Sequence, residues 1–521
     1  MTIQKNMIMK YLSILTIGIF SFLALPSCSD LAPEFYDVIA EENFFKSEAE
    51  YIAALGSAYT NLYGMCNHGT YFSLQEVSSD EACIPIKGPD WEDGQQWLRV
   101  HRHMYNASEG VFNNVWNFCY GGINTCNRLI FTFESAGAAG ADAYIAELRG
   151  LRAYYYLILL DVFGNVPLVT QFDVPEGFKP ATVSRQEVYN FVENELVTQI
   201  PLLSKEVNST TYARVNYYVG QMMLLNLYLN AEVYTTTPQW QKTIDAANEI
   251  INSGIYSLEG NYFNNFSANN SSSKENIFVI PYDAVNAGGF NMSQMTLHYE
   301  SQKTFKLIEQ PWNGYTTLAE FYNAFSPDDI RLTGGGLRPY GVLLYGQQYS
   351  SEGDSLKDGS DLWYPDNDGR NVNFSPELNE LGPTAWRDGG ARISKYEYVQ
   401  GGRQSMNNDF AIYRYADVLL SKAEAQWRLG AGTGEALDLV NMIRDRAGVP
   451  TFSSLDADNL LAERGREMCF ETKRRTDLIR FGRYGDARWE KPVDDGPHRT
   501  LMPIPLGQLQ INDQLDQNPG Y

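Results

Sequence analysis

The chain has 521 residues, 44% of them hydrophobic and 13% aromatic, and its formal net charge is −23 at pH 7. An acidic surface of this size repels nucleic acid and anionic membrane surfaces, so it excludes nucleic-acid binding and favours neutral or basic ligands. The length and the apolar fraction suffice for one large domain or for two to four ordinary ones.

The first residues have the layout of a secretory signal. Lys5 and Lys10 precede an uncharged apolar run over residues 11–25. As a helix this run would be about 22 Å long, short of the roughly 30 Å hydrocarbon core, so a membrane-spanning anchor is the weaker interpretation.

The sequence Leu25-Pro26-Ser27-Cys28, which closes this run, resembles the lipobox of bacterial lipoproteins. The resemblance implies a signal peptide over residues 1–27 and lipidation of Cys28, which would anchor the mature chain to outer-membrane lipid. Ser29 follows the cysteine in place of an acidic residue, which leaves the outer membrane open as a destination without excluding the inner one. Cleavage nearby that leaves Cys28 as a free thiol is the alternative.

Five further cysteines remain once Cys28 is lipidated, and an odd number argues against a disulfide framework. Cys119 and Cys126 lie two helical turns apart, too far to bridge, so we expect them to pack as small buried apolar groups.

Helical periodicity dominates both ends of the chain. The segments with helical spacing and helix-terminating residues are 47–64, 109–133, 141–163, 184–203, 214–234, 239–253, 409–429, 435–447 and 456–474. Helix pairs of this length indicate a repeat array, and Ile52, Leu55, Gly56 and Tyr59 match the first half of the tetratricopeptide pattern. The predicted fold class is therefore mainly α, with a tetratricopeptide-like scaffold; a plain helical bundle is the alternative.

The amino-acid composition changes over residues 254–405, which are rich in Gly, Asn, Ser and Asp. Short β-type runs such as "NIFVIPY" and "GVLLYG" interrupt this segment, while "GGGLRPYG" is typical of a turn. A loop-rich insertion of this length is uncommon in a helical protein unless it is functional.

Signatures of catalysis and of cofactor binding are missing. The sequence contains no G-x-S-x-G, H-E-x-x-H, G-x-x-x-x-G-K-[ST] or G-x-G-x-x-G motif. Asp366-Asn367-Asp368-Gly369 begins like a calcium loop, but Arg370 occupies the next ligand position and no glutamate closes the loop. We therefore expect no enzyme, no cofactor and no metal, although a glycosidase carboxylate pair carries no sequence signature.

Several tryptophans stand in polar loops, where a hydrophobic core cannot easily use them. They are Trp91 and Trp97 around "EDGQQ", Trp312 in "EQPWNGYTT", Trp363 in "SDLWYPD" and Trp386 in "PTAWRDGG". The apolar face of a sugar ring stacks on an indole, and neighbouring Asp, Asn, Gln and Arg side chains bind its hydroxyls. The set favours a carbohydrate ligand, although packing within the loop explains any single ring equally well.

Several stretches together resemble the SusD/RagB family of outer-membrane nutrient-binding lipoproteins. They occur in family order as "ENFFKSEAEYIAALGSAYTNLYG", "SSDEACIP", "AELRGLRAYYYLILLDVFGNVPLVT", "YRYADVLLSKAEAQWRLG", "VNMIRDRAGVP", "LLAERGREMCFETKRRTDLIRFGRY" and "LMPIPLGQLQINDQLDQNPGY". We interpret the arginines and glutamates of the last helical stretches as scaffold rather than site, with Arg466, Glu467, Glu471 and Arg474 forming ion pairs along one helix face.

The resemblance implies a cell-surface protein that captures an oligosaccharide or polysaccharide and closes as a lid over a SusC-like TonB-dependent transporter, breaking no bond. The predicted organisation is a helical part over 28–253 with a binding loop near 78–105, a ligand-binding insertion over 254–405, and a helical part over 406–521 packed on the scaffold. Uptake of peptide, which some family members perform, is the main alternative, and a glycoside hydrolase is another.

The family implies an aromatic platform but no fixed platform residues, so position and composition choose them here. We expect Trp91 and Trp312 first, then Tyr282 and Trp363, as glycan-stacking rings. Asp80 and Asn313 are the candidates for binding hydroxyls. We expect Arg331 to hold the fold instead.

Overall fold

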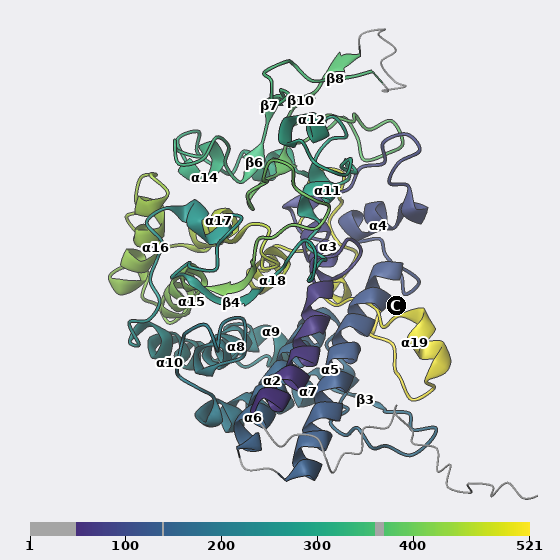
Figure 1. The fold of residues 1–521 in the computed structure, drawn as a ribbon, viewed down its shortest axis with the longest axis vertical. Helices are drawn as coiled ribbons and strands as arrows, with labels where there is room; N and C mark the ends of the chain where they lie inside the picture. Colours follow the sequence, from purple (N-terminus) through teal and green to yellow (C-terminus); the bar gives the residue numbers. More distant parts are fainter. Residues whose placement is uncertain (1–47, 138–139, 360–368) are drawn as a thin grey trace, which may run out of the picture. The chain divides into compact units, whose positions relative to one another are not determined.

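The computed structural model describes residues 48–137, 140–359 and 369–521, which belong to one compact unit (Figure 1). The predicted signal over 1–27, the lipidation site Cys28 and the candidate ring Trp363 lie outside the described residues. The division of the chain at residues 253 and 405 stays a prediction.

The first helices form where periodicity predicts them. The segment 47–64 forms α2 (Glu48–Thr60) and the 3₁₀ helix η2 (Asn61–Gly64), and the next two segments form α5 (Gly110–Ala136) and α6 (Ala141–Val162). Figure 1 shows α5 and α6 side by side, and they pack along their length. Gly164 follows α6 with a φ of 72°, a left-handed conformation that glycine adopts readily and that terminates the helix.

The next helix pairs continue the scaffold. The elements are α7 (Arg185–Gln199), η4 (Ile200–Leu202), α8 (Tyr217–Leu229), α9 (Ala231–Thr235) and α10 (Trp240–Ile251). Ser184 and Glu187 form a reciprocal capping box at the start of α7, and the side chain of Asn216 accepts from two backbone N–H groups at the start of α8. These caps satisfy amide groups that a helix start leaves without partners.

Two C-terminal predictions need correction. The segment 409–429 begins as strand β12 (Phe410–Arg414) and becomes helical only in α15 (Tyr415–Arg428). Its first residues pair with β4 (Asn276–Ile280), and this tertiary pairing overrides the local helical pattern. The segment 456–474 ends its helix α17 (Ala457–Met468) early, because Phe470 and Thr472 have φ values of 57° and 60°. Helices α16 (Glu435–Arg446) and α18 (Arg474–Arg480) lie before and after α17.

The insertion contains short elements rather than a continuous sheet. Its helices are η5 (Tyr262–Phe266), α11 (Met292–Thr296), α12 (Ser301–Phe305), α13 (Ala319–Tyr322) and α14 (Ile330–Thr333). Besides β4–β12, the antiparallel strand pairs of the described chain are β1 (Ala82–Cys83) with β5 (Thr316–Thr317), β2 (Val166–Pro167) with β3 (Thr182–Val183), β6 (Leu343–Leu344) with β11 (Arg392–Ile393), β7 (Gly346–Gln347) with β10 (Asn373–Phe374), and β8 (Lys357–Asp358) with β9 (Arg370–Asn371).

The β1–β5 pair positions the candidate site. It joins the predicted binding loop near residues 78–105 to the insertion, with Ala82 opposite Thr317 and Cys83 opposite Thr316. The elements that lead into and out of this loop are α3 (Tyr71–Val77), η3 (Asp93–Gln95) and α4 (Gln96–Arg102). Residues more than 200 positions apart in the sequence therefore meet at one place.

The C-terminal segment is fastened across the helices. The last elements are η6 (Pro497–Thr500) and α19 (Leu506–Ile511). The N–H of Met502 donates to the carbonyl of Val162, and Gln508 Nε2 donates to Asn113 Oδ1 of α5 over 2.9 Å. Figure 1 shows α19 beside α5. The extended segment 502–505, which reads "MPIP", is thus held over the helical scaffold.

Buried ion pairs hold the C-terminal helices to the insertion. Arg331 is fully buried and pairs with Asp329, Glu463 and Glu467 at 2.7–3.0 Å. Arg414 pairs with Glu275 and Glu467 at 2.6 Å, and with Glu471 at 2.7 Å. The prediction that Arg331 holds the fold is confirmed.

Of the four residues expected to form ion pairs along one helix face, only Arg466 pairs within its own helix, with Glu463 of α17 at 2.6 Å. Glu467 and Glu471 reach arginines on other elements, and Arg474 pairs with Asp80. These charges tie distant segments together because α17 ends before Glu471 and Arg474.

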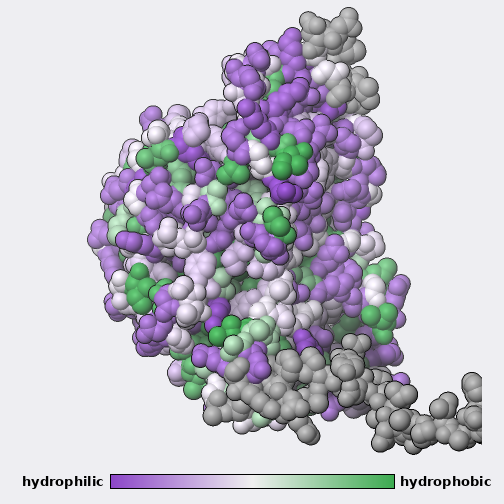
Figure 2. Space-filling view, in the orientation of Figure 1, coloured by the Kyte–Doolittle hydropathy of each residue, from purple (hydrophilic) through white to green (hydrophobic). Residues whose placement is uncertain are grey.

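The face of the molecule drawn in Figure 2 is mainly hydrophilic. Figure 2 shows hydrophobic residues on one face only as small, separated patches. Within the described ranges no helix is both long enough and apolar enough to cross a membrane. The five described cysteines are free and buried, in agreement with the expected packing of Cys119 and Cys126.

Candidate ligand-binding cleft

Trp91 and Trp312, the first two candidates from the sequence, line one open pocket. Its volume is about 440 Å³, within the usual range for small-molecule sites. The lining residues are His68, Asp90, Trp91, Asp93, Tyr299, Gln310, Pro311 and Trp312. The loop after β1 therefore meets the insertion in a cleft with two indoles and several hydroxyl-binding groups.

The loop that carries Trp91 is conformationally strained. Trp91, Asp93 and Gln95 have φ values of 67°, 38° and 62°, and Gly94 between them is also left-handed. Non-glycine residues in this region cost on the order of 1 kcal/mol or more each, and they persist only where their surroundings impose them. Asn313, beside Trp312 in the facing loop, has a φ of 58°. Backbone strain of this kind clusters at functional sites, so its presence in both loops favours a binding site at this place.

The two loops fasten directly to each other. Trp91 Nε1 donates to the carbonyl of Trp312 over 2.6 Å. Gly314 leaves the room for this contact, because a Cβ there would lie 2.3 Å from the Trp91 ring. A side chain at Gly314 is therefore incompatible with the observed position of Trp91.

Buried cations support the loop from beneath. Lys87 Nζ donates to the carbonyls of Asn313 and Gly314 over 2.6 and 2.8 Å. Burial, reinforced by nearby Arg392, lowers the pKa of Lys87 well below its usual value. An Arg392 guanidinium N–H donates to Asn313 Oδ1 over 3.0 Å.

His68 supports the platform from its inner side. Its ring meets Trp91 edge to face at a centroid distance of 5.0 Å, and its Nδ1 lies 2.8 Å from the Tyr315 hydroxyl. Burial lowers the pKa of the imidazole below 6.5, although Asp93, 3.8 Å from Nε2, acts in the opposite direction. His68 is therefore mainly neutral at pH 7.

Acceptors stand on either side of Trp91. The Tyr299 hydroxyl donates to Asp90, and Arg387 stacks over the Tyr299 ring at 4.4 Å. Asp93 accepts from Trp97 Nε1 over 2.9 Å, and its side chain is 40% exposed. Carboxylate oxygens accept several hydrogen bonds each, so both aspartates have capacity left for ligand hydroxyls.

The other candidates do not join this cleft. Tyr282 is only 3% exposed, and its hydroxyl donates to the Tyr63 carbonyl over 3.2 Å. Asn313 is fully buried, and its amide donates to the Arg387 carbonyl. Both carboxylate oxygens of Asp80 are held by Arg474, which outweighs burial and lowers the Asp80 pKa. The expected ligand contacts of these three side chains are not supported by their positions, because each is already committed within the chain.

Six lining residues were not among the candidates, and two of them, Gln310 and Pro311, directly precede Trp312. Asp90 and Asp93 lie within two residues of Trp91, so sequence proximity could have marked them. His68 and Tyr299 carry no such signal, because only the tertiary fold brings them to the cleft. Trp97, the other ring of the loop, is buried and 5.2 Å from His68, so it packs rather than binds.

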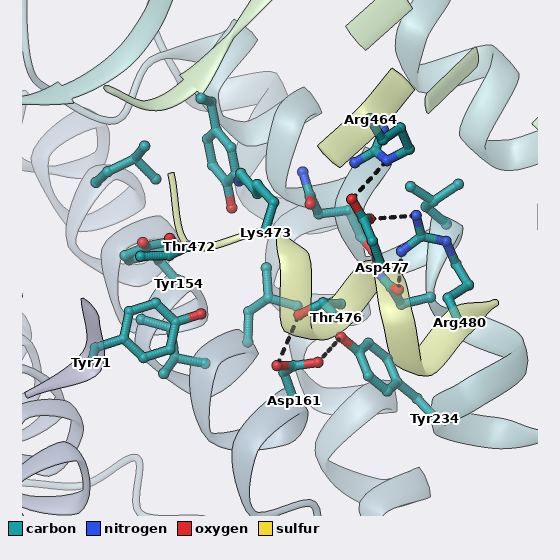
Figure 3. Close-up of a pocket in the computed structure, with 17 residues that line it drawn as sticks. Tyr71, Tyr154, Asp161, Tyr234, Arg464, Thr472, Lys473, Thr476, Asp477 and Arg480 are labelled. Carbon is teal, nitrogen blue, oxygen red and sulfur yellow. Dashed lines mark hydrogen bonds and ion pairs between the residues drawn. The ribbon is translucent and has the colours of Figure 1, made fainter. Parts of the chain in front are cut away.

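Two other pockets differ in character. Figure 3 shows an interior pocket in which Thr476 and Tyr234 each donate to Asp161, and Arg464 and Arg480 each donate to Asp477. Its volume of about 60 Å³ suits a few water molecules, since one needs about 10–15 Å³.

A more open pocket of about 550 Å³ lies between residues 207–216 and 255–279. Its two tyrosines are committed to the protein: Tyr256 is 6% exposed and the Tyr212 hydroxyl donates to Asp409. Of the three pockets, the cleft at Trp91 alone combines indole rings with strained backbone. Among the described residues, no group of three or more His, Cys, Asp or Glu side chains is placed to hold a metal ion.

Comparison with known proteins agrees with this architecture. The family model described as "SusD family" matches residues 274–497, and the one described as "Starch-binding associating with outer membrane" matches residues 37–229. The chain belongs to the SusD/RagB family. The sequence-based prediction of the family is thus confirmed, as is the mainly helical fold class with its tetratricopeptide-like scaffold.

Individual family members align over almost the whole chain. SusD-like protein P2 of Formosa agariphila is 26% identical, over 96% of this chain and 98% of its own. Starch-binding protein SusD of Bacteroides thetaiotaomicron is 25% identical, over 87% of this chain and 85% of its own.

Solved SusD-like structures share the fold at lower identity. A laminarin-binding SusD-like protein superposes with a TM-score of 0.72 at 22% identity, covering 92% of this chain and all of its own. Surface glycan-binding protein A of Bacteroides thetaiotaomicron, in complex with laminarihexaose, has a TM-score of 0.73 at 22% identity, covering 90% of this chain and 99% of its own.

Proposed function

We propose that this protein binds a glycan in the cleft between Trp91 and Trp312 and serves as a surface capture protein for carbohydrate uptake. The observation that carries the proposal is the meeting of these two indoles in one open pocket, between two strained loops. Indole faces stack on sugar C–H faces, and Asp90, Asp93 and Gln310 supply hydrogen-bonding groups at the same place. The binding of starch and of laminarin by related proteins supports a carbohydrate as the ligand class.

Calorimetric titration of the protein lacking residues 1–28 against neutral oligosaccharides tests this proposal. The panel holds hexaoses of α-1,4-glucan, β-1,3-glucan, β-1,4-glucan, xylan and mannan. We expect heat from at least one of them and a loss of tenfold or more in affinity in Trp312→Ala and in Trp91→Ala, about 1.4 kcal/mol or more.

A matched control removes a ring outside the cleft. Phe131 of α5 is 39% exposed and is not among the residues that line the pocket, so Phe131→Ala should bind as tightly as the wild type. Trp91→Phe keeps a ring but loses the N–H donor to the Trp312 carbonyl, which separates stacking from loop fastening. The absence of binding heat with every oligosaccharide of the panel contradicts the proposal, and binding heat with a peptide library would favour the peptide alternative.

The absence of catalysis needs its own measurement. A bound oligosaccharide recovered intact after long incubation, as judged by mass spectrometry, agrees with a binder that breaks no bond. Shortened products would favour the glycoside hydrolase alternative.

The proposed partner is a SusC-like TonB-dependent transporter, over which the protein closes as a lid, with lipidated Cys28 as its anchor. Family membership and the outer-membrane association named by one family model support this setting. Tagged full-length protein should co-purify with an outer-membrane barrel, and Cys28→Ala should leave the outer-membrane fraction. Retention of the Cys28→Ala protein in that fraction would contradict lipid anchoring.

A further inference from the structure

The charges around the cleft are one-sided. Asp90 and Asp93 line it, and Glu92 stands between them on the exposed loop. Among the described residues that line the cleft, none is a lysine or an arginine. The chain as a whole strengthens this bias, because its formal net charge is −23.

The nearest cations are turned away from the opening. Lys87 is 2% exposed and donates to two backbone carbonyls, and Arg392 is fully buried beneath Asn313. Arg99 forms a two-point ion pair with Glu109 at 2.6 and 2.7 Å. Lys87 and Arg392 stabilise the loops from inside, and Arg99, whose side chain is 34% exposed, is committed to Glu109 and to the Gly94 carbonyl.

Two more groups with a possible positive charge are likewise committed. Arg387 lies over the Tyr299 ring and pairs with Asp358 at 2.9 Å. His68 borders the cleft, but its partly buried ring packs on Trp91 and its Nδ1 meets the Tyr315 hydroxyl. An anionic ligand would therefore meet carboxylates without a compensating cation in the lining.

We infer that the cleft selects electrically neutral glycans and rejects those that carry carboxylate or sulfate groups, with Asp93 as the main discriminating side chain. The inference rests on the proposed function, since it concerns the same cleft. Asp93 is the more exposed of the two aspartates, and it is free of the tyrosine hydroxyl that Asp90 accepts. Its oxygens accept hydrogen bonds from the hydroxyls of a neutral sugar, and they repel a negatively charged substituent placed there.

Oligosaccharides matched in linkage and length test the selection. The probes are laminarihexaose and maltohexaose, each neutral, oxidised to the carboxylate at C6, and oxidised then methyl-esterified. The methyl ester has the bulk of the carboxylate without its charge. For the wild type at low salt we expect at least tenfold weaker binding of the carboxylate form, and recovery of most of that loss with the ester.

Salt and side-chain changes identify the source of the selection. Raising the salt concentration to about 0.5 M should narrow the affinity gap, by which we mean the difference in affinity between the neutral and the carboxylate oligosaccharide, because the Debye length falls with ionic strength. Asp93→Asn, which keeps an acceptor for Trp97 Nε1, should narrow the gap severalfold, and Asp93→Lys should abolish it. Asp458→Asn, at an exposed carboxylate of α17 whose side chain is 79% exposed, is the matched control and should leave the gap unchanged.

The outcomes separate the two proposals. If no neutral probe and no member of the neutral panel binds, the proposed function fails and this inference fails with it. If a neutral probe binds and the carboxylate form binds equally well, only the selection is overturned. An affinity difference that persists in Asp93→Lys would also overturn the selection by Asp93. Equally weak binding of the methyl ester would overturn it as well, because the cause would then be the size of the substituent rather than its charge.

Discussion

The helical scaffold and the cleft use charge in opposite ways. In the scaffold, Glu463 and Glu467 of α17 meet Arg331, Arg414 and Arg446 in a buried network in which each charge has partners of the opposite sign. In the cleft, Asp90 and Asp93 stand at the surface with no lysine or arginine among the lining residues. Complete pairing specifies how segments join, whereas one-sided charge leaves capacity for a ligand.

Backbone conformation separates the same two regions. The scaffold helices begin at ordinary N-caps such as Ser184 and Asn216. The cleft loops instead hold Trp91, Asp93 and Gln95 in left-handed conformations that cost stability. Four of the eleven described non-glycine residues with positive φ thus lie in the two cleft loops, while others, such as Phe470 and Thr472, follow a scaffold helix.

The largest expected effect comes from breaking the scaffold network. Arg414→Met leaves Glu275, Glu467 and Glu471 buried with one partner fewer, and we expect a loss of about 3–5 kcal/mol in the free energy of unfolding. Urea unfolding measures it. Arg483→Met, at an exposed pair, is the control and should leave the midpoint unchanged; equal midpoints for all three proteins would contradict the network's role.

A buried carboxyl pair at the joint between the two regions should make stability depend on pH. Glu76 accepts from the N–H of Thr472, and Glu81 accepts from the N–H of Phe470. Burial raises the pKa of Glu76 to about 7, and burial together with Glu76 raises that of Glu81. Because both folded pKa values lie above the unfolded value of about 4.5, both groups stabilise the protein fully below that pH. The Glu76 contribution is lost as pH rises through about 7, and the Glu81 contribution is lost as pH rises through its own raised pKa.

Glu81→Gln should remove most of this dependence. Its amide N–H donates to Glu76 where the wild type needs a shared proton, so the variant should be more stable than the wild type by about 1–3 kcal/mol at pH 8. At pH 4.5 the two proteins should be nearly equal. Urea midpoints from pH 4.5 to 8 test it, and parallel curves for the two proteins would contradict the shared proton.

A single methyl group should disturb the cleft with little effect on the scaffold. In Gly314→Ala the new Cβ meets the Trp91 ring, so the indole must move. We expect about tenfold weaker glycan binding and a loss of about 1–2 kcal/mol in stability. Titration and tryptophan fluorescence measure these effects. Gly507→Ala, where no heavy atom lies within 4 Å of the new Cβ, is the control; normal binding by Gly314→Ala would show that Trp91 is not fixed as described.

The smallest effect concerns a residue expected in the site. Asp80→Asn weakens the two-point pair with Arg474, with N–O distances of 2.7 and 2.8 Å, and should lower the free energy of unfolding by about 1 kcal/mol. Glycan affinity should stay within twofold of the wild type. A loss of glycan affinity at unchanged stability would contradict this expectation and would indicate that Asp80 contacts the glycan.

The sequence by itself determined the family, the mainly helical fold and most helix positions. Apolar spacing and capping residues act locally, so α5, α6 and α7 lie close to where these patterns predict them. Trp91 and Trp312 were also recognisable, because a large ring in a polar loop has few partners nearby in the sequence.

Only the tertiary structure decided which polar side chains stand beside those rings. The same sequence features describe Asp80 and Asp93, yet Arg474 occupies the first while the second stays 40% exposed. The pattern of residues 409–429 likewise predicts a helix throughout, yet Phe410–Arg414 pairs with a strand from the insertion. Burial and pairing depend on segments hundreds of residues away, so the local sequence does not predict which polar side chains are buried or paired.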